Sequence, residues 1–474
     1  MRTWKPAPGA GAGETSVPCS RRAFLKSSAL LSGAALWDAM RPRPAAAAPP
    51  TVARVGFIAH VGSAQSLPRS PAGLEVAGYA GLLGARAGAE EMGATARLLG
   101  REFDVAVATA MSPAAAVRAA GRLVAVEGAF AIAGGYGTET ALALAEFAER
   151  QRVVFFNVGA TSDALRGESC GRYTFHVEAS DAMYLDALAD WFTRGLAFLV
   201  DEDAPQGVRI IRRAPTRRWF LVAAGAPIWQ ARRLRAHAAL ERRHWGGRVV
   251  GDVVMDAGAG QVRDVLRAID QAHPDLVLLL LGPDAQLSFM KQYETAGLRF
   301  EVSGFPEPLT QTRVFLAGLL AAAPRSAGES IRAVLWDPAV RYAGALELNS
   351  RFAARWKHPL DGPAWAAWCA IKILGEVALR AHTTDPAQVV RYLESDRAAL
   401  DGHKGIVLTF RRWDHQLRQP LEMVRLQRDS GDLMGTAEPV GAIPNVNAPG
   451  RDPQQVLDQL GDLAQESTCR FSII

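Results

Sequence analysis

Short apolar runs alternate with amphipathic segments along the chain from residue 52 onward. The runs are apolar at consecutive positions, which is typical of strands buried on both faces, and the segments between them repeat apolar residues at helical spacing. Strands of this kind joined by helices predict a parallel α/β sheet. In this first set we expect strands at 52–59, 103–109, 129–133 and 153–158, and helices at 72–94, 113–127 and 138–150.

The same plan restarts near residue 181, so a chain of 474 residues is expected to form two α/β lobes. The polar, Arg-rich stretch 196–218 is expected to be an irregular surface insertion, and the polar tail after 428 is expected to have no core of its own. The second set comprises helices at 181–194, 228–245, 260–272 and 284–296 with strands at 219–223, 248–255, 276–281 and 302–305; helices at 310–323, 345–356, 363–380 and 386–395 and strands at 406–411 and 420–426 follow.

The first 48 residues have the pattern of an export signal. Ser20-Arg21-Arg22-Ala23-Phe24-Leu25-Lys26 resembles a twin-arginine signal, and small residues up to Ala48 suggest a cleavage site. The apolar stretch between them contains Lys26 and Asp38 and is about 15–17 residues long, too short and too polar to span a membrane. The alternative is an amphipathic or disordered arm.

The excess of positive charge belongs to this same segment. The chain has 53 basic and 48 acidic residues, of which residues 1–48 hold seven and two. The remaining chain therefore carries equal numbers of both signs, which argues against broad capture of nucleic acid. Within it, eleven arginines gather between 209 and 248, which we interpret as a solvated face or as a docking patch for an acidic partner; they are Arg209, Arg212, Arg213, Arg217, Arg218, Arg232, Arg233, Arg235, Arg242, Arg243 and Arg248.

No catalytic or metal-binding motif is found. The sequence contains no HExxH, no GxxxxGK[ST] and no GxSxG, and its nine histidines are scattered without ligand spacing. Gly135-Tyr136-Gly137 follows a strand, but the third glycine position is Thr140, so a dinucleotide site is disfavoured. We expect neither an enzyme nor a cofactor, and no metal.

Two turns are the best candidates for ligand binding. Gly135, Tyr136, Gly137 and Thr138 form one strand-to-helix turn, and Ala160, Thr161 and Ser162 follow the next strand. Helix first-turn N–H groups favour an anion or a carbonyl oxygen, and open α/β sheets bind ligands at the carboxyl ends of their strands. The alternative is that these glycines only make turns.

From 52 to 428 the plan resembles the Leu/Ile/Val-binding class of periplasmic receptors, the type I periplasmic-binding fold. Several motifs resemble more narrowly the ABC substrate-binding proteins associated with PQQ-dependent alcohol dehydrogenase systems. They include Phe156–Ala160, Asp163–Arg166, Cys170–His176, Ala182–Leu188, Arg217–Val222, Leu348–Phe352, Trp365–Trp368, Phe410–Pro420 and Glu466–Arg470.

The resemblance implies two Rossmann-like lobes with parallel sheets, joined by three hinge segments and closing on a ligand. Its implied division is a signal peptide at 1–48, lobe 1 at 51–178 plus 309–382, lobe 2 at 181–303 plus 386–428, and a C-terminal tail at 429–474. It also implies a periplasmic protein, exported by the twin-arginine route, that hands a small molecule to a membrane ABC permease.

The class also suggests site residues. Its lobe 1 turns, matched here to Gly135–Thr138 and Ala160–Ser162, hold the carboxylate of an amino acid. Lobe 2 usually supplies an aromatic residue and an acid; residues 223–229 lack the expected Asp and Tyr, and Glu307 matches the second acid. An amino acid is therefore no more expected than a neutral or acidic small molecule connected with alcohol oxidation.

The narrower family also implies a disulfide between Cys170 and Cys469, since both lie in its motifs and the destination is oxidising. The alternative is two unpaired surface thiols, whereas Cys369 lies in an apolar helix and is expected to be buried and free.

Three hypotheses remain at this point. The first is a transport receptor. The second is a sensor or accessory subunit touching a periplasmic quinoprotein dehydrogenase, and the third is a cryptic enzyme.

Overall fold

The computed structural model describes residues 52–63, 70–194, 196–200, 208–212, 214–243, 246–255, 259–428, 431–446 and 450–471. Residues 51–474 form one compact unit. The expected export signal and its cleavage site lie outside the described residues. Among the described residues, no helix is both long and apolar enough to cross a membrane, and no three His, Cys, Asp or Glu side chains are grouped to hold a metal ion.

Lobe 1 is built on a five-stranded parallel sheet in the order β2-β1-β3-β4-β5. Its strands β3 and β4 are buried at every position, as the apolar runs predicted. The elements are β1 (Val52–Ala59), β2 (Glu102–Thr109), β3 (Ala131–Gly134), β4 (Val154–Asn157) and β5 (Thr174–His176), with helices α2 (Glu75–Leu98), α3 (Pro113–Ala125) and α4 (Thr138–Gln151).

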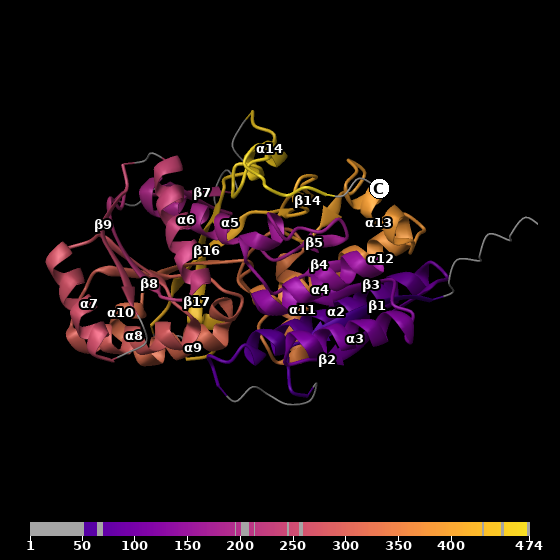
Figure 1. Ribbon diagram of the computed structural model, residues 1–474, viewed down its shortest axis with the longest axis horizontal. Coiled ribbons are helices and arrows are strands. Elements are labelled where there is room, and N and C mark those ends of the chain that lie inside the picture. The colour runs from indigo at the N-terminus through magenta and orange to yellow at the C-terminus, as the bar shows by residue number, and fades with distance from the viewer. Residues whose placement is uncertain are drawn as a thin grey trace, which may run out of the picture. The chain divides into compact units, whose positions relative to one another are not determined.

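Lobe 2 has a four-stranded parallel sheet in the order β11-β10-β8-β9. Alternate residues of β8 enter two different cores: Trp219 and Leu221 face one, Phe220 and Val222 the other. Helices therefore cover both faces, α5 and α6 on one side and α7, α8 and α9 on the other (Figure 1). The elements are α5 (Asp181–Arg194), β8 (Arg218–Ala224), α6 (Pro227–Arg243), β9 (Arg248–Met255), α7 (Ala259–Ala272), β10 (Leu276–Leu280), α8 (Pro283–Ala296) and β11 (Glu301–Gly304). The expected α/β fold with parallel sheets in two lobes is confirmed.

The remaining elements divide between the lobes differently from the expected boundaries. Helix α9 (Arg313–Ala322) lies in the second core with Phe220, although 309–382 was expected in lobe 1. Conversely, α13 (Pro386–Leu393) and Phe410 of β14 pack against lobe 1, the latter on Phe156 and Phe175. The other elements here are η2 (Leu309–Gln311), α10 (Pro324–Ala327), α11 (Ala345–Trp356), α12 (Gly362–Arg380), β13 (Leu400–Asp401), β14 (Val407–Phe410) and β15 (Leu417–Arg418).

Two stretches expected to be irregular contain strands. Within 196–218, β6 (Leu196–Val200) and β7 (Val208–Arg212) pair as an antiparallel hairpin. Beyond 428, β17 (Ala437–Ile443) pairs with β16 (Leu421–Leu426), which also pairs with β12 (Ile331–Val334). Because Ala437, Val440 and Ile443 are buried, the expectation that the tail has no core is wrong for this segment.

Helix α12 joins the lobe 1 core along α2, and Figure 1 shows the two helices side by side. Trp365 and Trp368 lie three positions apart on α12 and are fully buried. Trp365 stacks on Trp336 and donates its Nε1–H to the carbonyl of Gly402, whereas Trp368 donates to Glu91. Both residues therefore serve packing in lobe 1.

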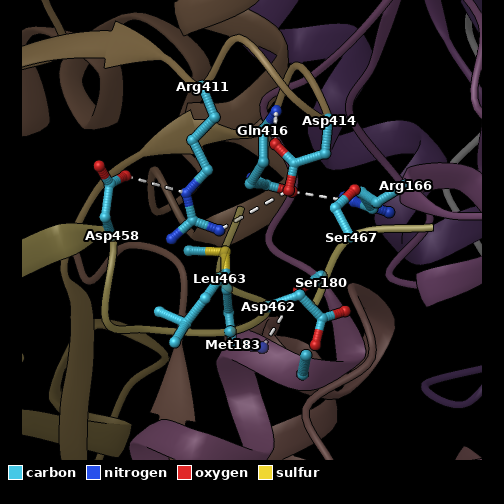
Figure 2. Close-up of polar contacts among 12 residues, drawn as sticks. Arg166, Ser180, Met183, Arg411, Asp414, Gln416, Asp458, Asp462, Leu463 and Ser467 are labelled. Carbon is cyan, nitrogen blue, oxygen red and sulfur yellow. Dashed lines mark hydrogen bonds and ion pairs between the residues drawn. The ribbon is translucent and has the colours of Figure 1, made fainter. Parts of the chain in front are cut away.

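The last part of the tail wraps around a buried arginine. Arg411 donates from Nη2 to the carbonyls of Leu457 (2.8 Å) and Leu460 (2.6 Å), and helix α14 (Pro453–Leu457) begins this segment. Figure 2 shows Arg411 between the carboxylates of Asp458 and Asp414, at 3.3 and 3.8 Å. The tail thus supplies both charge and hydrogen-bond acceptors to a side chain that is 1% exposed.

Beyond this point the tail contacts both lobes. On lobe 2, Asp462 and Glu466 form ion pairs with Arg235 and Arg242 of α6. On lobe 1, Cys469 forms a disulfide with Cys170, with the Cα atoms 5.6 Å apart, which is the expected pair. Cys369 is buried and free.

Candidate functional site

The two predicted turns lie side by side at the carboxyl ends of β3 and β4. Gly137 donates its N–H to the carbonyl of Gly159 over 3.1 Å, which joins one turn to the other. Gly137 has φ 81°, a backbone conformation that strongly favours glycine, and α4 begins at the next residue. The N–H groups of the first turn of α4 thus lie beside the second turn, as the sequence predicted.

Two buried polar side chains, those of Asn157 and Arg166, hold the backbone of the second turn in place. Asn157 accepts from the N–H of Ala160 (3.0 Å) and donates to its carbonyl (2.8 Å). Arg166 donates to the carbonyls of Ala160 and Ser162, at 3.0 and 3.1 Å. These bonds engage the N–H of Ala160 and the carbonyls of Ala160 and Ser162, so the hydroxyl groups of Thr161 and Ser162 and the N–H groups of these two residues carry the remaining chemistry of the turn.

Tyr136 occupies a different environment from its neighbours in the first turn. Its side chain is 1% exposed, and its hydroxyl lies against α2, where a Cβ on Gly81 would be 1.6 Å away. Burial, and secondarily the charges of Glu178 and Asp361, raises the pKa of this phenol well above its usual range. Tyr136 therefore packs into lobe 1, which makes it a support of the turn.

Arg232 of α6 reaches from lobe 2 into the second turn. Its Nη2 donates to the hydroxyl of Thr161 (3.0 Å), its Nε to Asp181 (3.1 Å) and its Nη1 to Glu307 (2.8 Å). The arginine is 2% exposed. One side chain of lobe 2 thereby brings together two of the predicted site residues, Thr161 and Glu307.

Two aromatic rings hold the guanidinium of Arg232 in place. Its central carbon lies 4.3 Å from the ring centre of Trp229 and 4.1 Å from that of Phe305. Burial disfavours the charge, but the carboxylates of Asp181 and Glu307 more than offset it and raise the pKa of Arg232. Arg232 is thus permanently charged, and its N–H donors lie in one plane.

Three parts of the chain form a junction next to this site. Glu178, between β5 of lobe 1 and α5 of lobe 2, accepts at Oε1 from the hydroxyl of Tyr184 (2.6 Å), and that hydroxyl accepts from Gln311 of η2 (2.7 Å). Gln416, between β14 and β15, donates to the carbonyls of His176 and Glu178. The Phe410–Pro420 motif singled out in the sequence is therefore part of this junction.

Glu178 is an acid of the junction whose pKa is strongly raised. It is fully buried, and its Oε2 has no hydrogen-bond partner among the described residues. Burial raises the pKa of Glu178 to about 7, although the hydroxyl of Tyr184 and the charge of Arg166 act in the opposite direction. The carboxyl consequently changes protonation near neutral pH.

Sequence reasoning missed Arg232, Asp181, Trp229 and Phe305. Arg232 was one of the eleven clustered arginines, and nothing in the local pattern distinguishes it from Arg233, which pairs with Asp252. Several other arginines of that cluster also bind groups of the same chain. Arg218 donates to the carbonyls of Ala272 and His273. Arg235 pairs with Asp462, and Arg242 pairs with Glu466. Five of the eleven arginines therefore bind groups of this chain.

Two α/β lobes with parallel sheets and polar groups that face one another between them define a two-lobed ligand-binding protein. A family model described as "Periplasmic binding protein" matches residues 69–432, and the chain belongs to this family. Proteins of this kind bind small ligands and deliver them to ABC permeases, and membership implies the periplasm. None of the curated proteins compared with the chain matches it.

Solved structures agree on the fold. A branched-chain amino acid ABC transporter periplasmic ligand-binding protein from Burkholderia xenovorans is 18% identical, covers 88% of this chain and 99% of its own, and has a TM-score of 0.69. A leucine binding protein from Thermotoga maritima is 13% identical, with 82% and 98% covered and a TM-score of 0.61. A solute binding protein of an ABC transporter from R. palustris, in complex with benzoate, is 17% identical, with 88% and 99% covered and a TM-score of 0.62.

Proposed function

We propose that the protein captures a small polar organic molecule between its lobes, against Gly135–Thr138 and Ala160–Ser162, and passes it to a membrane ABC permease. The observation that carries this proposal is the contact between Arg232 of lobe 2 and Thr161 of lobe 1. A polar group of one lobe that meets the other lobe at the carboxyl ends of its strands lies where open α/β sheets receive ligands.

The same contacts disfavour an amino acid as the ligand. Glu307, the residue matched to the ammonium-binding acid of the class, is already paired with Arg232. A cation in the site and the N-terminus of α4 favour a ligand with negative charge or hydrogen-bond acceptors. The benzoate complex of the R. palustris relative supports an organic acid.

The rest of the proposal comes from the resemblance to substrate-binding proteins of PQQ-dependent alcohol dehydrogenase systems. We assign the protein to a PQQ-dependent alcohol oxidation system and its export to the twin-arginine route, on the motifs given above. Carboxylic acids are products of alcohol oxidation, which is consistent with recognition by Arg232. A periplasmic sensor or accessory subunit of a quinoprotein dehydrogenase, using the same fold and cleft, is the second candidate.

A ligand screen tests capture directly. The mature protein is screened by thermal shift against small alcohols, acids, amines and amino acids, and each hit is followed by small-angle X-ray scattering. A ligand at 100 times its Kd should stabilise the protein by about 2.7 kcal/mol, and closure about the connections should reduce the radius of gyration. Hits that leave the radius unchanged would contradict capture between the lobes.

A further inference from the structure

Arg232 makes three polar contacts that differ in how firmly each partner is held. Asp181 is 7% exposed at its side chain and begins α5, and its N–H donates to the carbonyl of Thr161 over 2.7 Å. Thr161 belongs to the turn fixed by Asn157 and Arg166 and is 2% exposed. These two partners are therefore fixed parts of the site.

Glu307 is the exception. Its side chain is 24% exposed, and it lies in the connection between β11 and η2 and not within a helix or strand. It contacts Arg232 through Oε1, at 2.8 Å. Of the groups that hold the guanidinium, Glu307 is the one that can leave without disturbing a helix or the turn.

The rings of Trp229 and Phe305 limit how another molecule can approach. They cover the guanidinium at 4.3 and 4.1 Å, so its N–H groups are reachable only at the edge of its plane. That edge is taken by Thr161, Asp181 and Glu307. A planar carboxylate matches the spacing of two guanidinium N–H groups, and a ligand that carries one can replace a carboxylate already there.

The charges around Arg232 favour a ligand that replaces one of the carboxylates there over a ligand that adds a third. Arg232 faces the carboxylates of Asp181 and Glu307, so the direct partners already exceed its single positive charge. A third carboxylate in the same buried place would meet two like charges. A ligand that displaces Glu307 leaves the number of carboxylates on Arg232 unchanged.

We propose that the site around Arg232 takes small organic carboxylates, whose carboxylate group displaces that of Glu307 from Arg232. This inference rests on the proposed capture between the lobes and names its ligand class. Glu307 is then a built-in competitor that occupies the recognition group when the ligand is absent, and Arg232 is the residue that determines specificity for acids.

The test compares carboxylates with their uncharged amides on the mature protein. Benzoate, propionate, benzamide and propionamide are titrated by calorimetry and thermal shift into the wild type and the Glu307→Gln, Glu307→Ala and Arg232→Gln variants. Arg233→Gln is the matched control, because Arg233 lies next in the helix but pairs with Asp252 away from the site.

We expect a carboxylate, but not its amide, to bind the wild type and to bind Glu307→Gln at least ten-fold more tightly, since the neutral side chain competes less well. Propionate, which resembles the missing side chain, should raise the Tm of Glu307→Ala. Binding should be lost in Arg232→Gln and kept in Arg233→Gln. If Arg232→Gln does not fold, the two Glu307 variants decide the matter.

The proposal is overturned if Glu307→Gln binds carboxylates no more tightly than the wild type, if amides bind equally well, or if no carboxylate binds any form. Arg232 is then an internal ion pair that holds the lobes together. Should alcohols or amines bind and compact the wild type in that case, capture between the lobes stands and only the ligand class falls. If no compound compacts the protein, the proposed function falls as well.

Discussion

Gly137 and Gly159 are joined by a hydrogen bond of 3.1 Å that links the turn after β3 to the turn after β4. Neither glycine tolerates a side chain, for different reasons. Gly137 has φ 81°, whereas a Cβ on Gly159 would lie 2.5 Å from a ring carbon of Tyr136. The paired turns therefore depend on backbone shape, and this dependence can be measured.

Gly137→Val should weaken ligand binding at least ten-fold and destabilise the protein by about 1–3 kcal/mol, because a β-branched residue is strained at positive φ. Calorimetry with a ligand from the screen and urea unfolding give the two values. Gly121→Ala in α3 is the control: its Cβ would meet Phe147 at 4.0 Å, an ordinary contact. A folded Gly137→Val protein with unchanged affinity would place the site elsewhere.

Arg411 and Arg412 are adjacent arginines with opposite environments. Arg411 is 1% exposed at its side chain and is surrounded by the tail, whereas Arg412 is 62% exposed and pairs with Asp396 on the surface. Arg411→Ala should cost about 3–5 kcal/mol, since it removes the cation beside the buried carboxylate of Asp414 and a donor to the carbonyls of Leu457 and Leu460, and Arg412→Ala about 0–1 kcal/mol. If urea unfolding gives equal losses of stability for the two variants, the tail does not depend on Arg411.

Glu178→Gln should remove part of the pH dependence of stability. The pKa of Glu178 is raised to about 7 in the folded protein, above the ordinary glutamate value of 4.5. The wild type therefore loses stability as pH rises from about 4.5 to about 7, and a glutamine does not. Relative to the wild type, the variant should become more stable to unfolding across this pH range, by at most about 3 kcal/mol, with no further increase at higher pH. Parallel pH profiles of Tm for the two proteins would rule out this role of Glu178.

The disulfide between Cys170 and Cys469 closes a sequence separation of 299 residues. The chain-entropy model assigns such a bond about 5–6 kcal/mol as an upper figure. A twin-arginine substrate crosses the membrane folded, so reduction should release the tail and leave both lobes intact. Hydrogen exchange should rise at 456–471 in reduced protein and in Cys170→Ser alike.

Mass spectrometry of non-reduced peptides from periplasmic protein tests the bond itself. Two alkylatable thiols at positions 170 and 469 would contradict it. Cys369 is an internal reference: burial raises the pKa of its thiol to about 12, so it should resist alkylation until the protein unfolds.

Export should depend on Arg21 and Arg22 as a pair. Changing both to lysine preserves the charge but should leave full-length protein in the cytoplasm, as judged by fractionation and immunoblotting. A single Lys5→Arg change outside the motif is the control and should be exported normally. Processed double-lysine protein in the periplasm would refute the signal assignment.

The inner strands of the sheets were predictable because they are buried on both faces and leave uninterrupted apolar runs. Two of the missed strands lack that signature: β5 has three residues, and β17 contains Pro439 and Gly441. The two turns of the site were visible as glycine-rich junctions. Arg232 was not, because its meaning depends on Asp181, Thr161 and Glu307, which reach it from distant parts of the chain and have no fixed sequence spacing.

The antiparallel sheet β12-β16-β17 has a consequence for self-association. Without β17, the central strand β16 would present a free edge, and free edges recruit strands from other molecules. β17 covers that edge and is itself a poor template, since Pro439 offers no N–H and the register shifts at Met423 and Val424. The segment after 428 thus protects a concentrated protein against aggregation at this sheet.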